Sequence, residues 1–178
     1  SLITAGVDVG FDWTIPFNVF GDARLTISDT LTYVDKLDTI AAGASNNGHF
    51  VDTISAGIGG ATPRWANALT VGYRTDKLLA QVRHIWKEGP RQNYVGSTYR
   101  AGFPDGTTGR VPDLHLVNLS LRYQVSDNFS LTGVVNNLLN KFPPQTISGQ
   151  GEQANTNISF YDPYALGRNY TVQATVRF

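Results

Sequence analysis

Cysteine and methionine are both absent from this sequence of 178 residues. Without cysteine there can be no disulfide bond, no thiolate metal site and no cysteine nucleophile. No run approaches the roughly 18 apolar residues that a membrane-spanning helix needs, and no signal peptide is recognisable. The charges also cancel, with 14 basic and 14 acidic residues. No net field therefore favours nucleic acid as a partner.

Alternation of apolar and polar residues is the main pattern that is present, and it is clearest at the C-terminal end. Polar residues separate the apolar ones at every second position: Tyr170, Val172, Ala174, Val176 and Phe178. Because successive side chains of a strand point to opposite faces, this segment has one apolar and one polar face. It is either an ordinary edge strand of a soluble protein or the closing strand of a transmembrane barrel, between lipid and a wet lumen.

Six earlier segments are also predicted to be strands, and most of them keep the same period of two. They cover residues 7–15, 23–33, 65–73, 78–86, 117–123 and 129–135. Asp29, Asn67 and His84 interrupt the alternation, because they are polar residues at apolar positions. No convincing helical stripe occurs, so the pattern predicts an all-β chain of about seven antiparallel strands.

The predicted connections alternate between short and long. Residues 16–22, 74–77 and 126–128 form short turns, whereas residues 36–64, 87–114 and 140–167 form long connections rich in Gly, Asn, Thr and Pro. Structureless loops of more than about 15 residues are uncommon in compact soluble domains. Short periplasmic turns and long extracellular loops are typical of outer-membrane barrels. The pattern therefore predicts an antiparallel up-and-down transmembrane β-barrel.

In such a barrel the first strand would run toward the periplasm, and the following strands would alternate in direction. These directions divide the aromatic residues of the apolar face into two groups. Aromatic rings favour the two membrane–water interfaces, so we expect two girdles around an aliphatic band. A soluble β-sandwich offers no reason for such a separation. The expected extracellular group is Tyr33, Trp65, Trp86 and Tyr170, and the expected periplasmic group is Trp13, Tyr73, Tyr123, Phe129 and Phe178.

Three motifs resemble the C-terminal part of TonB-dependent outer-membrane receptors. The segment Val135-Asn-Asn-Leu-Leu-Asn-Lys-Phe-Pro-Pro144 is similar to that family's Val-x-Asn-Leu-Phe-Asp-Lys segment, with Leu139 in place of the usual aromatic and Asn140 in place of the acid. The second motif is Tyr161-Asp-Pro-Tyr-Ala-Leu-Gly-Arg168, and the third is the terminal alternation. With Pro63-Arg-Trp65 at the start of a strand, the resemblance covers nearly the whole chain.

The resemblance implies a barrel of 22 strands with a plugged lumen. Seven strands with two unpaired edges cannot close a barrel, so residues 1–178 are expected to be a partial barrel domain, the C-terminal third of a larger receptor. The plug domain and the earlier strands are expected to be missing, and Ser1 is expected to be a processed end or a cut.

The family resemblance also implies function, location and partners. We expect import of a scarce solute, such as a siderophore-like chelate or an oligosaccharide, with energy from the TonB system and without a cofactor. The expected location is the outer membrane of a Gram-negative bacterium. The expected partners are outer-membrane lipid, the rest of the barrel and the plug, the TonB system, the ligand and, through the C-terminal strand, the barrel-assembly machinery.

The connection over residues 87–114 is the best candidate for ligand contact. Guanidinium groups bind carboxylates or phosphates in a bidentate manner, and aromatic faces stack on rings or sugars. A solvated loop of mixed charge is the alternative, because Glu88, Asp105 and Asp113 offset the basic residues. The candidate residues are Arg91, Tyr94, Tyr99, Arg100, Phe103 and Arg110.

No pattern predicts catalysis or a metal centre, since His49, His84 and His115 lie on separate segments without metal-ligand spacing. The arginines on the predicted lumen side are expected to pair with Asp8, Asp12 or acids of the plug: Arg24, Arg83, Arg122 and Arg177. There are three alternatives. The first is a passive channel or small structural barrel without TonB, and the second is a soluble carbohydrate-binding β-sandwich. The third, an outer-membrane enzyme or autotransporter, would need a catalytic constellation or a passenger that the sequence does not show.

Overall fold

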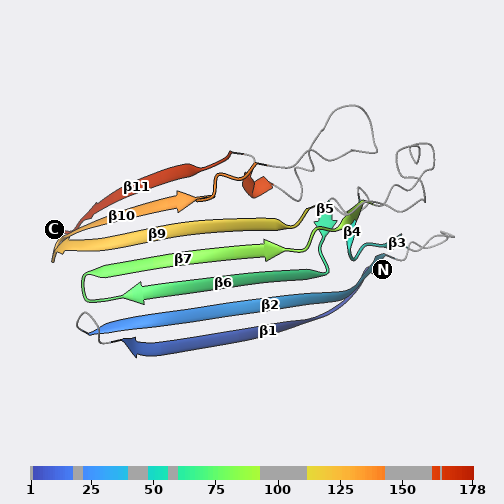
Figure 1. Cartoon of the computed structure of the whole chain (residues 1–178), viewed down its shortest axis with the longest axis horizontal. Helices are drawn as coiled ribbons and strands as arrows, with labels where there is room; N and C mark the ends of the chain where they lie inside the picture. The colour runs from blue at the N-terminus through green and yellow to red at the C-terminus, as the bar shows by residue number, and fades with distance from the viewer. Residues whose placement is uncertain are drawn as a thin grey trace.

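The chain folds into one main antiparallel sheet in the computed structural model, which describes residues 2–17, 22–39, 48–55, 60–92, 112–142, 162–164 and 166–178. Its long strands follow one another in chain order, each paired with the next (Figure 1). They are β1 (Leu2–Phe17), β2 (Ala23–Thr39), β6 (Trp65–Arg74), β7 (Leu78–Lys87), β9 (Leu114–Ser126), β10 (Phe129–Asn136) and β11 (Asn169–Val176). The prediction of an all-β, up-and-down arrangement of seven antiparallel strands is confirmed, and the sheet is not closed.

Four short strands lie in connections that the sequence predicted to be structureless. β3 (Gly48–His49) pairs with β2, while β5 (Gly60–Thr62), β4 (Thr53–Ser55) and β8 (Arg91–Gln92) form a second, small sheet. The prediction was wrong here, because strands of two or three residues are too short to show a period of two. One turn of 3-10 helix, η3 (Asp162–Tyr164), precedes β11. No helix within the described residues has the length and hydropathy of a membrane span.

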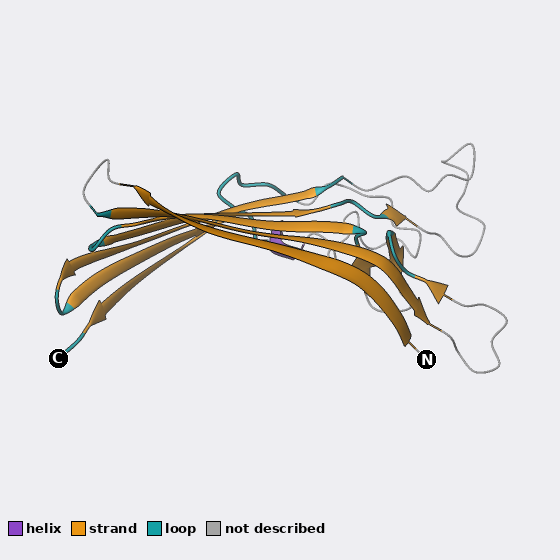
Figure 2. Ribbon diagram, turned by 90° about the horizontal axis from the view of Figure 1, so that it is seen from below, coloured by secondary structure: helices purple, strands orange, loops and turns teal. Residues whose placement is uncertain are grey.

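The main sheet is a single twisted and curved layer (Figure 2). Its large apolar side chains are exposed, for example Val9 at 58%, Val82 at 42% and Val172 at 80%. A soluble sandwich would bury such side chains against a second sheet. The described residues contain no second sheet that covers them, because the only other sheet consists of the short strands β4, β5 and β8.

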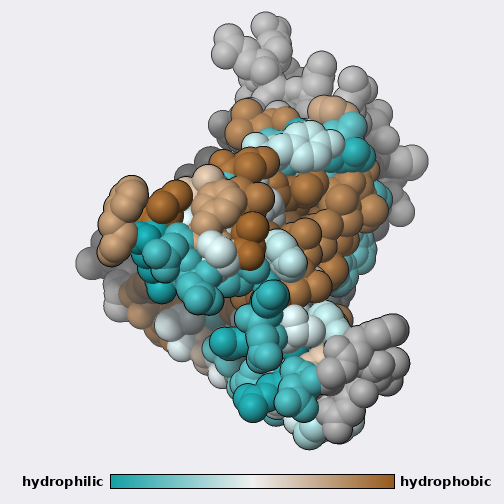
Figure 3. All heavy atoms as spheres, turned by 90° about the vertical axis from the view of Figure 1, so that its left-hand side faces the viewer, coloured by the Kyte–Doolittle hydropathy of each residue, from teal (hydrophilic) through white to brown (hydrophobic). Residues whose placement is uncertain are grey.

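The strand register keeps the two faces of the sheet separate across all seven long strands. One row of partners runs from β1 to β11 on the apolar face: Trp13, Ile27, Val71, Val82, Leu119, Val135 and Tyr170. The adjacent row lies on the polar face: Thr14, Thr26, Gly72, Gln81, Ser120, Val134 and Thr171. Viewed from the end with the short turns, hydrophobic residues form a broad area along one flank (Figure 3).

Successive strands are also staggered, so that the sheet is sheared. β10 and β11 lie shifted toward the end that carries the short turns, relative to β1 and β2 (Figure 1). Tilt and stagger of this kind are what a sheet needs in order to close into a barrel. A bulge between Ala5 and Gly6 shifts the register of β1 against β2. Glycine is required there, because a Cβ on Gly6 would lie 2.5 Å from the carbonyl oxygen of Tyr33.

Candidate functional site

The three long connections leave the same end of the main sheet, here called the loop end, and the short turns lie at the opposite turn end (Figure 1). They join β2 to β6, β7 to β9 and β10 to β11. The first two are tied together because β4 pairs in parallel with β8, Thr53 with Arg91 and Ile54 with Gln92. The small sheet of β4, β5 and β8 therefore joins these two connections at the loop end.

Asp113 joins the two ends of the connection between β7 and β9. Its carboxylate accepts a hydrogen bond from the indole Nε1 of Trp86 at 2.9 Å and another from the backbone N–H of Gly89 at 2.8 Å. Hydrogen bonds to an ionised acceptor are roughly twice as strong as neutral ones. Asp113 therefore restricts the base of the connection that the sequence predicts to contact ligand.

The residues predicted to contact ligand lie almost entirely beyond the part of the chain that the structure describes. Arg91 is described through its backbone alone, as the first residue of β8. The other five candidates fall outside the described residues: Tyr94, Tyr99, Arg100, Phe103 and Arg110. The ligand loop therefore stays a prediction, and the structure adds Asp113, which the sequence suggested only as a charge that offsets the arginines.

Tyr164 holds the third long connection against β9. Its side chain is buried, its hydroxyl donates to the carbonyl of His115 at 2.5 Å, and it accepts from the N–H of the same residue at 2.6 Å. The hydroxyl thus supplies the hydrogen bonds that a neighbouring strand would give, where β10 has already ended. Burial raises the pKa of the Tyr164 phenol, partly offset by its bond to His115, so the hydroxyl stays protonated at neutral pH.

Asn137 directly follows β10 and organises the turn there. It is 1% exposed and has a positive φ of 52°, a backbone conformation that asparagine tolerates better than most residues. Its side chain donates to the carbonyl of Lys141 at 2.7 Å and accepts from the N–H of Lys141 at 3.0 Å. Its own N–H donates to Asn118 Oδ1 at 3.0 Å. The asparagine of the first family-like motif is therefore a buried turn residue.

The two family-like motifs meet at the start of β11. Asn140, also at positive φ, accepts a hydrogen bond at its Oδ1 from the N–H of Arg168 at 2.9 Å. Gly167 has a φ of 62°, and a Cβ there would approach Asn140 Oδ1 and the ring of Phe142 at 3.2–3.3 Å. An aspartate at position 140 would present the same acceptor oxygen, so the departure from the family's acid preserves this contact.

The polar face carries charges that have no ionic partner within the described part of the chain. Among the described residues, the ion pair found is that of Lys36 and Asp38, whose charged atoms are 3.9 Å apart. The predicted pairing of wall arginines with Asp8 or Asp12 is absent: Asp12 and Arg83 share a row but are three strands apart. The arginines without such a partner are Arg24, Arg83, Arg122 and Arg177. Pairing with acids of a plug domain stays a prediction.

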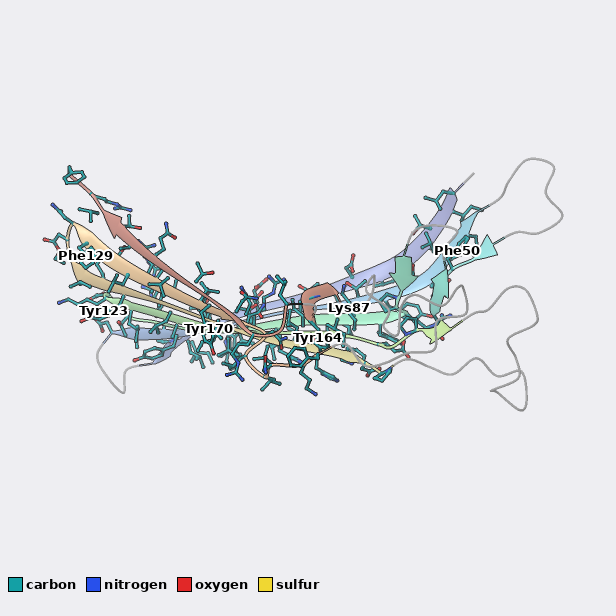
Figure 4. All side chains as sticks on the ribbon, turned by 90° about the horizontal axis from the view of Figure 1, so that it is seen from above. Phe50, Lys87, Tyr123, Phe129, Tyr164 and Tyr170 are labelled. Carbon is teal, nitrogen blue, oxygen red and sulfur yellow. The ribbon has the colours of Figure 1, made fainter. Side chains whose placement is uncertain are left out.

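The structure places the predicted girdle residues at different levels along the sheet. Tyr33 and Trp65 are register partners near the loop end, with ring centroids 4.5 Å apart. Tyr123 and Phe129 lie toward the turn end, and Tyr170 lies between them and Tyr164 (Figure 4). Trp13 pairs with Ile27, Tyr73 with Leu25 and Trp86 with His115, all on the apolar face. A role at membrane interfaces stays a prediction for these residues.

The C-terminal segment forms one of the two free edges of the main sheet. β11 pairs with β10 alone among the described strands, and its predicted apolar residues share the exposed apolar face. Their backbone partners on β10 alternate as the pattern requires, for example Val172 with Gly133 and Val176 with Phe129. A free edge of this kind needs a further strand in a membrane, where water cannot satisfy its backbone.

A single-layer, sheared, up-and-down sheet with an apolar outer face defines the wall of a β-barrel. Comparison with known proteins identifies the kind of barrel: a family model described as TonB dependent receptor-like, β-barrel, matches residues 3–138. The chain belongs to this family of TonB-dependent receptors and forms part of its β-barrel.

Among solved structures, the chain is similar to a mutant form of the ferric enterobactin receptor from Pseudomonas aeruginosa. The two share 18% sequence identity with a TM-score of 0.58, over 99% of this chain and 22% of that chain. The chain therefore spans about a fifth of the receptor whose fold it shares. No curated protein matches the chain.

Proposed function

We propose that residues 1–178 form a partial barrel domain of an outer-membrane receptor in a Gram-negative bacterium, which imports a scarce solute with energy transmitted by TonB. The observation that carries this proposal is the exposed apolar face of the main sheet in a chain that belongs to the receptor family. A bilayer is the solvent that such a face fits, and the polar face then lines a wet or plugged lumen.

The ligand would bind on the loop side of the wall. The bases of two long connections are joined there by β4 and β8, and Asp113 restricts one of them. Restricted loops lose less conformational entropy on binding, so their affinity is higher. The expected ligand is a siderophore-like chelate or an oligosaccharide, which the predicted arginines and aromatic residues would bind.

The lumen side would contact the plug. The unpaired arginines of the polar face, such as Arg83 and Arg122, fit acidic groups of that domain better than the distant Asp12. The free edges at β1 and β11 would continue into the remaining strands of the same barrel. The barrel-assembly machinery would engage the chain through β11, and TonB would act on the plug.

An uptake assay with the full-length receptor tests this proposal. Cells that express it as their main route for large solutes are offered a panel of labelled ferric siderophores and oligosaccharides, with and without TonB. We expect uptake of one compound class to require both the receptor and TonB. A passive channel, the second candidate, would instead admit small solutes equally well in cells without TonB, and that result would contradict energy-coupled import.

Asp113→Ala tests the contribution of the loop base in the same cells. Loss of its two hydrogen bonds is expected to weaken binding of the identified compound about tenfold (about 1.4 kcal/mol). This is less than the net ~1.5–3 kcal/mol of one hydrogen bond to a charged group, because Asp113 is exposed to solvent and acts on the ligand only through the loop. Asp76→Ala, in the exposed turn between β6 and β7, is the matched control. Equal affinities of the two variants would show that Asp113 does not organise the binding loop.

A further inference from the structure

His84 and His115 form a side-chain pair on the apolar face that the sequence does not reveal. His84 lies on β7 and His115 on β9, and they are diagonal neighbours: His84 faces Val117, and His115 faces Trp86. Nε2 of His84 lies 3.2 Å from Nδ1 of His115. The two residues are 31 positions apart in the chain, so the sequence shows no metal-ligand spacing, and the strand register brings the residues together.

The two rings meet edge to edge. Their planes are within 12° of each other, and their centroids are 5.4 Å apart. The facing nitrogens are 3.2 Å apart, which is 2.2 Å less than the centroid distance. Each nitrogen is therefore on the ring edge that faces the other ring. An edge-to-edge pair directs the lone pair of at least one nitrogen into the space between the rings, where a proton or a cation can be held.

We propose that His84 and His115 form a two-histidine site for a divalent transition-metal ion such as zinc, nickel or copper. Two imidazole nitrogens bound to one tetrahedral zinc ion at about 2.0–2.1 Å lie roughly 3.3 Å apart, close to the separation found here. Imidazole suits these ions, whereas calcium and magnesium prefer oxygen ligands. The ion would lie off the line between the two nitrogens, so binding would replace their hydrogen bond and tilt each ring until its lone pair points at the ion.

The pair lies two residues beyond Val82 on β7, toward the loop end and beside Trp86, which is predicted to lie at the extracellular membrane interface. Water or a small ligand would fill the remaining coordination positions there. Leu69 is the register partner of His84 on β6, and Trp86 is that of His115 on β7. Asp113 immediately precedes β9, and both of its oxygens already accept hydrogen bonds from Trp86 and Gly89. No group of three or more potential metal-ligating residues occurs within the described ranges. A site with two protein ligands is expected to bind zinc more weakly than a closed structural site with four.

A bound ion would link β7 to β9 directly beside the base of the connection between them. Trp86 is the register partner of His115, and Asp113 holds the Trp86 indole. The backbone of His115 is in turn fixed by Tyr164. The site therefore lies where the bases of two long connections meet. It requires only the strand register, so it does not depend on which solute the receptor imports.

Zinc titration by calorimetry on metal-free, detergent-purified full-length receptor tests the site, with copper(II) electron paramagnetic resonance as the second readout. We expect His84→Gln and His115→Gln each to weaken one equivalent of zinc binding tenfold or more. The copper spectrum should show two coupled nitrogens in the native receptor and one in each variant. His49→Gln is the matched control and should change neither measurement.

Glutamine keeps both positions polar, and retention of the heat-resistant folded form on a gel shows that each variant assembles. The proposal is overturned if the double variant of His84 and His115 binds zinc with the native stoichiometry and affinity. It is equally overturned if the native receptor shows no copper species whose nitrogen coupling depends on these two residues. Zinc binding can fail while TonB-dependent uptake persists, so the two proposals are tested separately.

Discussion

Val82→Arg is expected to destabilise the barrel by about 2–4 kcal/mol, the cost of an arginine at the bilayer midplane on the lipid face of a β-barrel. Val82 is on the apolar face of β7, between its register partners Val71 on β6 and Leu119 on β9. Its side chain is 42% exposed and both of its register partners are apolar, so neither partner can pair with a guanidinium. The charge would have to be placed in hydrocarbon or drawn toward an interface.

Gln81→Arg is the matched control, one residue away on the opposite face. Gln81 pairs with Gly72 and Ser120 on the polar face, where a charge meets water or the polar groups of a plug. Urea titration of the full-length receptor in lipid vesicles, followed by the gel shift of the folded form, measures both variants. Equal losses of stability would show that the two faces do not see different solvents.

Asn137→Ala is expected to reduce stability by about 2–3 kcal/mol. Alanine costs roughly 1 kcal/mol more than asparagine or glycine in a left-handed conformation, and an unmade buried hydrogen bond costs about 1–3 kcal/mol. Asn137 has a φ of 52° and makes two side-chain hydrogen bonds to the backbone of Lys141. The alanine variant therefore bears both costs. Lys141 is exposed, so water partly replaces the hydrogen bonds lost by its backbone, and the expected loss of stability lies at the lower end of this range.

Asn137→Gly separates the two contributions, because glycine adopts the positive φ freely and removes the side chain alone. We expect it to be about 1 kcal/mol more stable than the alanine variant, and less stable than the native receptor. The same vesicle titration supplies the measurement. If both variants matched the native receptor, the turn after β10 would not depend on this asparagine.

The long strands and the separation of their faces could be predicted from sequence because period-two alternation extends over many residues. Val7 to Ile15 and Tyr170 to Val176 illustrate this, since every second residue is apolar and all of them fall on one face. The sequence also showed which residues interrupt the alternation, but it could not show what those residues contact. In the structure, Asn67 donates a hydrogen bond to Asp29 at 2.7 Å, and His84 pairs with His115.

Contacts between distant segments could not be predicted, because they depend on register and on irregular turns. Tyr164 is 49 residues from His115, and Asn140 is 28 residues from Arg168. The motifs around Asn140 and Arg168 indicated the family, but their meeting at the start of β11 required the structure. The short strand β8 lacked any pattern that would have paired it with β4.

Site-directed spin labelling along β11 tests the central claim most directly, which is that one face of this sheet lies on lipid and the other on the lumen. Residues 1–178 contain no cysteine, so single cysteines from Tyr170 to Val176 can be labelled in the full-length receptor in vesicles once any cysteines outside this part are replaced by serine. Collision with oxygen should be high at Val172, Ala174 and Val176 and low at the positions between them, with the opposite pattern for a water-soluble nickel complex. Uniform access of the nickel complex to all these positions would contradict the account.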